Sequence, residues 1–335
     1  MAYTKAIHIL ILTLFCYSSP SLSATPTYNV QSFGAKPDGK SDCTKAFLSA
    51  WGAACAATAP ATIYVPRGRR SRAGLWACKN SGKSCPKGAT SLAFYNSNNI
   101  LVSGLTSLNS QMFHVRVDGC HNAKLINLQI SAPGNSPNTD GIHVQQSSGV
   151  TIMNSHVGTG DDCVSIGPGA SNLWIENLAC GPGHGISIGS LGWDLQEAGV
   201  QNVTVKTATF SGTENGVRVK TWARPSNGFV RDVLFQHLVM NNVQNPIIID
   251  QNYCPDHQNC PNQSSGVKIS DVTYEDVHGT SATAIAVKFD CSKTHPCTGI
   301  TLDEVKLTYG NKPATASCAN AGGSAAGVVQ PTSCL

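Results

Sequence analysis

The sequence has few charged residues and no long apolar run beyond its first 23 residues. Asp, Glu, Lys and Arg make up only 13% of the 335 residues, while hydrophobic residues make up 41% and glycine occurs 32 times. Disordered chains and coiled coils are rich in charge, so this composition excludes them. The net charge of +4 is small and scattered, which argues against a nucleic-acid partner and is compatible with an acidic one.

The first 23 residues have the features of a secretory signal peptide. A lysine at position 5 precedes an apolar run over residues 6–15, and small serines follow at positions 21 and 23. The apolar part is too short for a stable membrane span, and no later run is long enough for one. We therefore expect residues 24–335 to form a secreted, extracellular, soluble protein that needs no membrane partner.

No cysteine pair has the CxxC spacing of a zinc site, although the chain contains 14 cysteines. In an oxidising compartment, close pairs are typical of local disulfides. Removal of Cys16 with the signal peptide leaves thirteen cysteines, so at least one thiol stays unpaired. Four close pairs are the candidates: Cys163/Cys180, Cys254/Cys260, Cys291/Cys297 and Cys318/Cys334.

A short strand-like unit recurs along the chain, each time after Asn, Asp or Gly and with apolar residues in period two. Successive units begin 23 to 34 residues apart, and a second short strand precedes most of them. This pattern predicts a right-handed parallel β-helix of a single domain, because a propeller would need four antiparallel strands in each repeat. The first apolar residues of the units are Ile100, Ala123, Val150, Leu173, Val203, Val233, Val267 and Ile300.

The segment 41–57 is the clearest exception to the β pattern and predicts an amphipathic helix. Its apolar residues lie on one helical stripe, which we expect to cover the N-terminal end of the β-helix. The stripe consists of Phe47, Leu48, Trp51 and Ala54.

Three ionisable residues share one position of the repeat. Asp140, Asp162 and His184 each lie two residues before a second-type strand, and successive members are 22 residues apart. Equivalent residues of adjacent coils stack about 4.8 Å apart, so these side chains should form a ladder. Asn215 takes the same position one coil later. The strand that follows it, "GVRVKTW", should place Arg218 and Lys220 on the outer face.

Each of these residues also has an ordinary structural interpretation. An Asp beside Gly and Asn at a strand corner is most often a turn residue, and His184 between glycines could be a packed turn histidine. Arg218 and Lys220 alone would be a solvated strand face. The shared register favours a site, but parity does not decide the direction of Asp161, because Gly160 marks a corner.

Four ordered motifs resemble those of the plant polygalacturonases, the pectin-degrading glycoside hydrolases of family 28. They are "SPNTDGIHV", "GTGDDCVSIG", "GPGHGISIGSLG" and "GVRVKTW", and the only departure is Val219 in place of the usual isoleucine. The resemblance covers about residues 27–66 and 74–335. It implies a parallel β-helix that hydrolyses α-1,4-galacturonosyl linkages of an acidic polysaccharide, without metal or cofactor and as a monomer.

The resemblance also implies roles for individual residues. Asp161 would protonate the glycosidic oxygen, while Asp140 and Asp162 would activate the attacking water and cause inversion. His184 would support the acid, and Arg218 and Lys220 would bind the galacturonate carboxylate. Tyr253 is close to this face by repeat position, where stacking on a sugar and packing beside a disulfide are both open interpretations.

The junction over residues 66–74 departs from the family pattern. Four arginines and a serine fill it, and about two coils are missing relative to the family, which predicts either a tolerated short variant or a deletion that leaves Cys55 without its partner. Two alternatives stay open. One is a pectate lyase-like enzyme on the same fold, against which the GHG and DD motifs argue, and the other is a pectin-binding protein that has lost catalysis through the deletion. Endo or exo action depends on loops and is not decided by these motifs.

Overall fold

A computed structural model describes residues 25–38, 41–66, 74–81, 84–86, 88–255 and 258–335. The chain forms two compact units, Met1–Arg69 and Arg70–Leu335. The expected signal peptide and most of the arginine-rich junction lie outside the described residues. Among the helices that are described, none is long and apolar enough to span a membrane.

The first unit combines one α-helix with a small parallel sheet. Strands β1 (Thr27–Asn29) and β2 (Thr62–Tyr64) pair, and both contact helix α1 (Thr44–Cys55). A 3-10 turn, η1 (Val30–Phe33), also packs against α1. The expected helix is confirmed, but its predicted apolar stripe is partly wrong. Leu48 is 65% exposed, and the buried residues of α1 are Ala46 and Ala50. Its role as a cap stays a prediction.

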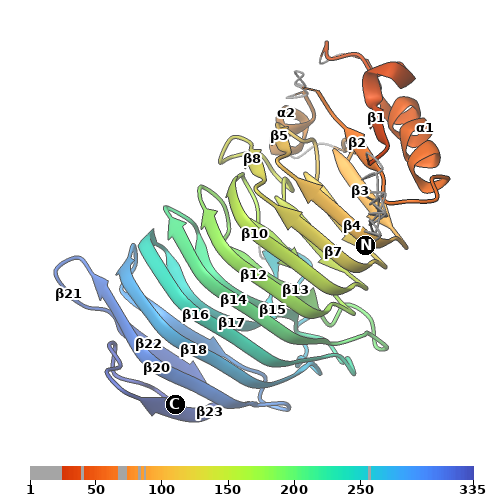
Figure 1. The fold of residues 1–335 in the computed structure, drawn as a ribbon. Helices are drawn as coiled ribbons and strands as arrows, with labels where there is room; N and C mark the ends of the chain where they lie inside the picture. Colours follow the sequence, from red (N-terminus) through yellow and green to blue (C-terminus); the bar gives the residue numbers. More distant parts are fainter. Residues whose placement is uncertain (1–24, 39–40, 67–73, 82–83, 87, 256–257) are drawn as a thin grey trace, which may run out of the picture. The chain divides into compact units, whose positions relative to one another are not determined.

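The second unit begins with helix α2 (Gly74–Asn80) and continues as a parallel β-helix (Figure 1). One of its two large sheets contains nine parallel strands, one from each coil. In spatial order these are β3 (Leu92–Tyr95), β6 (Val115–Asp118), β9 (Ile142–Gln145), β11 (Val164–Ile166), β13 (Ile186–Leu191), β15 (Asn215–Trp222), β17 (Asn245–Tyr253), β19 (Ile285–Asp290) and β22 (Thr315–Ala319).

The second large sheet contains twelve strands, and all but β21 pair in parallel. Together the sheets confirm the predicted right-handed parallel β-helix. The main path is β4 (Asn98–Ser103), β7 (His121–Ile126), β10 (Ser148–Gly158), β12 (Ser171–Cys180), β14 (Val200–Ser211), β16 (Phe229–Val243), β18 (Lys268–Ser281), β20 (Cys297–Tyr309) and β21 (Lys312–Pro313), with β5 (Thr106–Leu108), β8 (Gln129–Ser131) and β23 (Ala321–Ala326) beside it.

The recurrent Asn or Asp at the start of each unit makes a turn. These residues adopt left-handed backbone conformations, with φ between 54° and 56°, which Asn and Asp tolerate better than most residues. The asparagines also stack, since Asn122 Nδ2 donates to Asn99 Oδ1 over 2.7 Å and Asn202 Nδ2 donates to Asn172 Oδ1 over 2.6 Å. The residues in this position are Asn99, Asn122, Asn172, Asn202, Asp232 and Asp271.

The predicted register is correct for most coils and wrong for one. Val233 pairs with Val272 rather than with Val267, and Val272 pairs in turn with Ile300. The turn residue of this coil is therefore Asp271 and not Gly266. Val267 is nevertheless buried, and it lies directly before the first residue of β18.

All four predicted disulfides are present, together with Cys78–Cys85, which the sequence reasoning did not propose. Three of the described cysteines are unpaired. Cys43 and Cys120 are buried, whereas Cys55 is exposed. The prediction of at least one free thiol is therefore confirmed.

Candidate active site

The predicted ladder forms on the nine-stranded sheet. Val164 pairs with Ile142 on one side and with Ile186 on the other, and Ile186 pairs with Val217. Asp140, Asp162, His184 and Asn215 therefore occupy equivalent positions in four successive coils. A hydrogen bond also joins two of these positions in neighbouring coils, since Asn215 Nδ2 donates to the His184 carbonyl over 3.1 Å.

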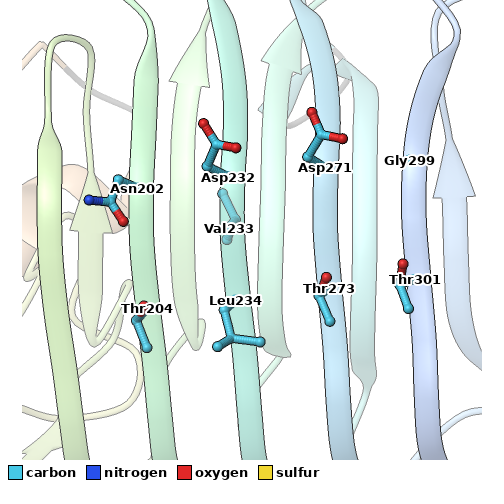
Figure 2. A pocket seen from close by; sticks show the side chains of 9 residues that line it. All are labelled: Asn202, Thr204, Asp232, Val233, Leu234, Asp271, Thr273, Gly299 and Thr301. Carbon is cyan, nitrogen blue, oxygen red and sulfur yellow. The ribbon is translucent and has the colours of Figure 1, made fainter.

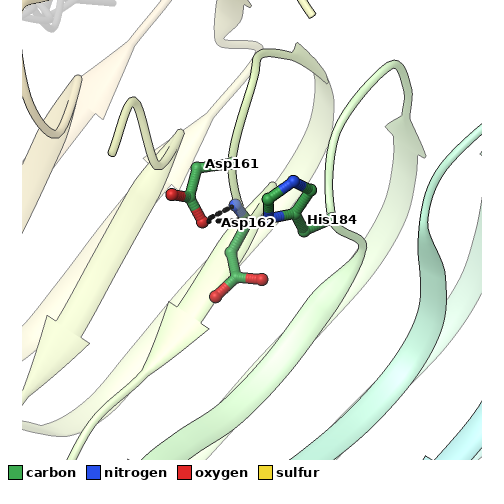
Figure 3. A group of neighbouring side chains, drawn as sticks. All are labelled: Asp161, Asp162 and His184. Carbon is green, nitrogen blue, oxygen red and sulfur yellow. Dashed lines mark hydrogen bonds and ion pairs between the residues drawn. The ribbon is translucent and has the colours of Figure 1, made fainter. Parts of the chain in front are cut away.

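The corner at Gly160 places Asp161 on the same side as Asp162. A Cβ atom at Gly160 would lie 2.3 Å from the Ser136 carbonyl oxygen, so only glycine allows this close approach. The Asp161 carboxylate accepts hydrogen bonds from the backbone N–H of Asp162 over 2.8 Å and of Asn138 over 3.1 Å. Figure 3 shows Asp161, Asp162 and His184 converging, with one ligand atom of each within 4.8 Å of the others.

Asp162 is the most enclosed of the three carboxylates and is held by cations. Lys220 Nζ lies 2.8 Å from Asp162 Oδ2, and Arg218 Nη2 lies 3.2 Å from Oδ1. The Ser187 hydroxyl donates to Oδ1 over 2.7 Å. Val217 and Val219 are fully buried in the core, so strand parity does place Arg218 and Lys220 on the outer face. They are not solvated there, because both are buried around Asp162.

Asp140 is buried beside the other two carboxyl groups, with 7% of its surface exposed. Burial is the main cause that raises the pKa of Asp140, to about 8, and the charges of Asp161 and Asp162 raise it further. A hydrogen bond with Ser165 and the charge of Lys220 act in the opposite direction but are weaker. Asp140 therefore holds a proton in neutral and mildly acidic solution.

Asp161 and His184 form an ion pair, with Asp161 Oδ1 3.3 Å from His184 Nδ1. Burial alone would raise the pKa of Asp161. The hydrogen bond and charge of His184, the charge of Lys220 and the hydrogen bond from Asp162 together outweigh burial, so the pKa of Asp161 is lowered. Burial would lower the pKa of His184, yet Asp161 and then Glu214 raise it above its ordinary value. Asp161 is also more accessible than Asp162, with 18% of its side chain exposed against 2%.

Glu214 is a site residue that the sequence reasoning missed. Its carboxylate lies 3.4 Å from His184 Nε2 and 3.8 Å from Arg218 Nη1. The imidazole of His184 therefore lies between two carboxylates. The available signal was the position of Glu214 directly before Asn215, which is already in the ladder.

A polar chain behind Asp140 was also missed. His143 Nδ1 lies 2.8 Å from Ser165 Oγ, and His143 Nε2 lies 2.9 Å from Gln145 Oε1. Gln145 Nε2 donates to Asp118 over 3.0 Å, which fixes Oε1 as an acceptor toward His143. Burial lowers the pKa of His143, so the ring is neutral, with its proton on Nε2. Nδ1 is then an acceptor that lies 2.8 Å from the Ser165 hydroxyl.

Strand parity contained the signal for this chain. One row of the sheet consists of four register partners, each of which directly follows a buried apolar residue of its strand. They are His143, Ser165, Ser187 and Arg218. Parity in the strand "GVRVKTW" alone predicts only Arg218 and Lys220 on this face. The same rule on the three preceding strands predicts every polar group that faces the carboxylates from this row.

A pocket of about 230 Å³ opens over these groups. Its walls include all three carboxyl groups together with Lys220 and Tyr253. Tyr253 is half-buried, with its ring 5.4 Å from Lys220 Nζ and 5.9 Å from the Arg218 guanidinium. The structure therefore brings together all seven residues proposed from the sequence, and it also places Tyr253 directly before the Cys254–Cys260 disulfide.

The chain matches a model of glycosyl hydrolases family 28 over residues 68–334. The chain belongs to this family. Residues 27–69 match a second model, described as rhamnogalacturonase A/epimerase, pectate lyase-like. The two matches meet at the boundary between the two compact units, where the shortened coils were predicted.

Among the relatives of this family 28 chain is a polygalacturonase from Prunus persica. It is 55% identical over 394 aligned residues, which cover 100% of both chains. That alignment is longer than the 335 residues of this chain, so the relative contains residues that this chain lacks. An exopolygalacturonase from Platanus acerifolia is 39% identical over 359 residues, covering 89% of this chain and 95% of its own length.

Solved structures support the family 28 fold. The endo-xylogalacturonan hydrolase from Aspergillus tubingensis superposes with a TM-score of 0.66 over 79% of this chain and 77% of its own. The identity is 23%, so the likeness concerns the fold alone.

The carboxylate cluster of this family 28 chain is poorly suited to a metal ion. Asp161, Asp162 and His184 offer one ligand atom each at suitable spacing. However, the cations of Arg218 and Lys220 already occupy the Asp162 oxygens, and His184 has a raised pKa that favours its protonated form. A metal would have to displace or face these positive charges, which opposes its binding.

A larger hollow of about 440 Å³ lies on the twelve-stranded sheet (Figure 2). Asn202, Asp232 and Asp271 form one row across neighbouring strands, and Thr204 lies in a second row. Asn202 and Thr204 belong to a glycosylation sequon, and Asn202 is exposed, as Asn262 of the second sequon also is. Arg231 lies 3.7 Å from the Asp232 carboxylate, but both side chains are more than half exposed. The hollow therefore differs from the family 28 site, where the cations around Asp162 are buried.

Proposed function

We propose that this protein is a secreted, extracellular polygalacturonase that hydrolyses α-1,4-galacturonosyl linkages of pectin. The single observation that carries the proposal is the convergence of Asp140, Asp161 and Asp162 beside His184, Arg218 and Lys220. Carboxyl groups supply the acid and the base of glycoside hydrolysis, and adjacent cations suit an acidic sugar. The name of the Prunus persica relative supports the same substrate.

In the proposed mechanism, Asp161 gives a proton to the glycosidic oxygen and the bond to the anomeric carbon breaks. Water attacks that carbon from the opposite side, and Asp140, with Asp162 beside it, takes the proton from the water. In the free protein the proton resides on Asp140, because its pKa is raised and that of Asp161 is lowered. The negative charge of a bound galacturonate beside Asp161 would raise the pKa of Asp161 and draw the proton to it. Asp140 is then ionised and able to act as the base.

Arg218 and Lys220 would bind the substrate carboxylate while they hold Asp162 in place. Tyr253 lies beside both cations in the pocket, where its ring could pack on a sugar ring. The side chains of this arrangement supply every proton and charge, so the proposed reaction needs no metal and no cofactor.

The experiment is an assay of reducing-sugar release from polygalacturonate with a chelator present. Hydrolysis by the purified chain supports the proposal. Products that absorb in the ultraviolet would show a lyase reaction instead, and binding without release of sugar would show a pectin-binding protein. Proton NMR of the first products tests inversion at the anomeric carbon, and their sizes separate endo from exo action.

A further inference from the structure

A row of aromatic rings extends from the pocket along the nine-stranded sheet. Tyr253, at the edge of the pocket, lies 5.2 Å from Trp222, centroid to centroid, and Trp222 lies 4.9 Å from Trp193. Both contacts are edge-to-face, with interplanar angles of 71° and 72°. Tyr253 and Trp222 are register partners on β17 and β15, and Trp193 follows β13. The row therefore extends from Tyr253 in the pocket wall across β15 to the segment that follows β13.

Arg224 lies at the outer end of this row. Its guanidinium lies 4.6 Å from the centre of the Trp193 ring. Within the described part of the chain, Arg224 has no ion pair with a carboxylate, in contrast to Arg218. Trp193 is 51% exposed although it is large and apolar. An exposed tryptophan with an unneutralised arginine over its ring is a combination that fits an acidic sugar.

The segment that carries Trp193 is held in place by hydrogen bonds. The Glu197 carboxylate accepts from the backbone N–H of Gly192 and, over 3.3 Å, from that of Trp193. The backbone N–H of Asn227 donates to the Leu195 carbonyl over 2.9 Å. On the other side, Gly266 N–H donates to the Arg224 carbonyl over 2.8 Å. Both side chains are therefore presented from fixed backbone, which lowers the cost of ordering them on binding.

We propose that Trp193 and Arg224 form an additional galacturonate-binding subsite on the side of the pocket marked by Tyr253. Trp193 would contact the apolar face of one sugar unit, and Arg224 would bind that unit's carboxylate with two parallel hydrogen bonds. The proposal rests on the proposed function, because a polymer of galacturonate must extend from the pocket across this surface. With this subsite, the affinity for galacturonate oligomers depends on their length and on whether their carboxylates are free.

The test compares Arg224→Ala, Arg224→Lys and Trp193→Ala in an Asp161→Asn background, where turnover is prevented. Calorimetry measures binding of galacturonate oligomers of increasing length. We expect Arg224→Ala to weaken binding of long oligomers on the order of tenfold, the value of one charge-assisted contact, and to leave the shortest ones unchanged. Arg224→Lys should lose less affinity than Arg224→Ala, and methyl-esterified oligomers should not distinguish the two Arg224 variants. Trp193→Ala should weaken binding of long oligomers whether or not they are esterified, because its contact is with the apolar sugar face.

Arg231→Ala is the control for an exposed arginine away from the pocket, although Arg231, unlike Arg224, lies 3.7 Å from a carboxylate, that of Asp232. Arg231 also lies over an aromatic ring, 4.9 Å from the centre of Phe229, but on β16 of the other sheet. It should leave binding of every oligomer unchanged. No loss in Arg224→Ala, or an equal loss at every length, would overturn the subsite. Length-dependent loss without hydrolysis by the unmodified protein would overturn the proposed function and support the subsite. Absence of binding by any oligomer would overturn both.

Discussion

Lys220 Nζ lies 2.8 Å from Asp162 Oδ2, and the two side chains are 8% and 2% exposed. The residues are 58 positions apart in the chain and meet because three coils of the β-helix stack. A buried carboxylate costs free energy unless cations and donors surround it, and Arg218 and Ser187 complete that shell. Lys220 is therefore a structural partner of Asp162 as well as a candidate substrate ligand.

The first prediction concerns the free energy of unfolding. Lys220→Met should lower it by about 3 kcal/mol, because Asp162 loses one of its two buried cations. Urea denaturation of the purified protein measures the change. Lys288→Met is the control, since Lys288 is 44% exposed and lies 4.0 Å from Asp290, and it should change stability little. Equal stability of both variants and the unmodified protein would contradict the structural role of Lys220.

Asp161→Asn should lower hydrolysis of polygalacturonate by about two orders of magnitude or more, the usual contribution of a general acid. Its fold should be unchanged, because Asp161 is partly exposed and an amide oxygen can still accept from Asp162 N–H. Asp162→Asn should lose as much activity but also stability, since it leaves Arg218 and Lys220 without a buried partner. Rates and circular dichroism of both variants separate these effects; near-normal turnover in both would refute the site.

The third prediction concerns the pH dependence of stability. Folding raises the pKa of Asp140 to about 8, so the folded protein binds more protons than the unfolded chain between the two values. The stability linked to Asp140 is then fully present below about pH 4 and is lost as pH rises toward 8. Asp140→Asn removes this dependence.

Melting temperatures of Asp140→Asn and the unmodified protein at pH 4, 6 and 8 measure this effect. The difference between the two proteins should shift in favour of the variant as pH rises. His184 and Asp161 titrate in both proteins, so a change in the difference reports Asp140 together with its charge interaction with Asp161. A difference that stays constant over this range would show that Asp140 has an ordinary pKa.

Glu214→Gln should make His184 lose its proton at lower pH. The negative charge of Glu214 helps to raise the pKa of His184, and glutamine removes that charge. NMR titration of the His184 ring reports the change directly, and the alkaline limb of the activity profile should move to lower pH. Glu176→Gln is a control, because Glu176 accepts from Trp174 on the other sheet. An unchanged His184 titration would argue against the contact.

The last prediction concerns the unpaired thiols. Cys55 is exposed at the end of α1, whereas Cys43 and Cys120 are buried. A thiol reagent should therefore label Cys55 in the native protein and the other two only after unfolding. Mass spectrometry of the labelled peptides identifies the sites. Labelling of Cys120 before Cys55 in native buffer would contradict this arrangement.

Repeat spacing and periodicity were enough to predict the β-helix, the ladder and four of the five disulfides. A parallel solenoid converts spacing in the chain into proximity in space, so the 22-residue separations of Asp140, Asp162 and His184 were sufficient to stack them. The one register error, Val267 for Val272, has a related cause. Apolar residues alternate with polar ones from Val267 and again from Val272. Only the pairing of β18 with β16 shows which of the two is the partner of Val233.

The differences among the three carboxyl groups depend on contacts that form only in the folded chain. The direction of Asp161 depends on the contact between Gly160 and Ser136, which belong to different coils. The burial of Asp140, the pairing of Asp162 with Lys220 and the contact of Glu214 with His184 likewise depend on distances across coils. Repeat spacing predicts which residues are neighbours. The burial of each carboxyl group and the charges around it follow from the packing of all the coils together, and they determine which carboxyl group holds the proton.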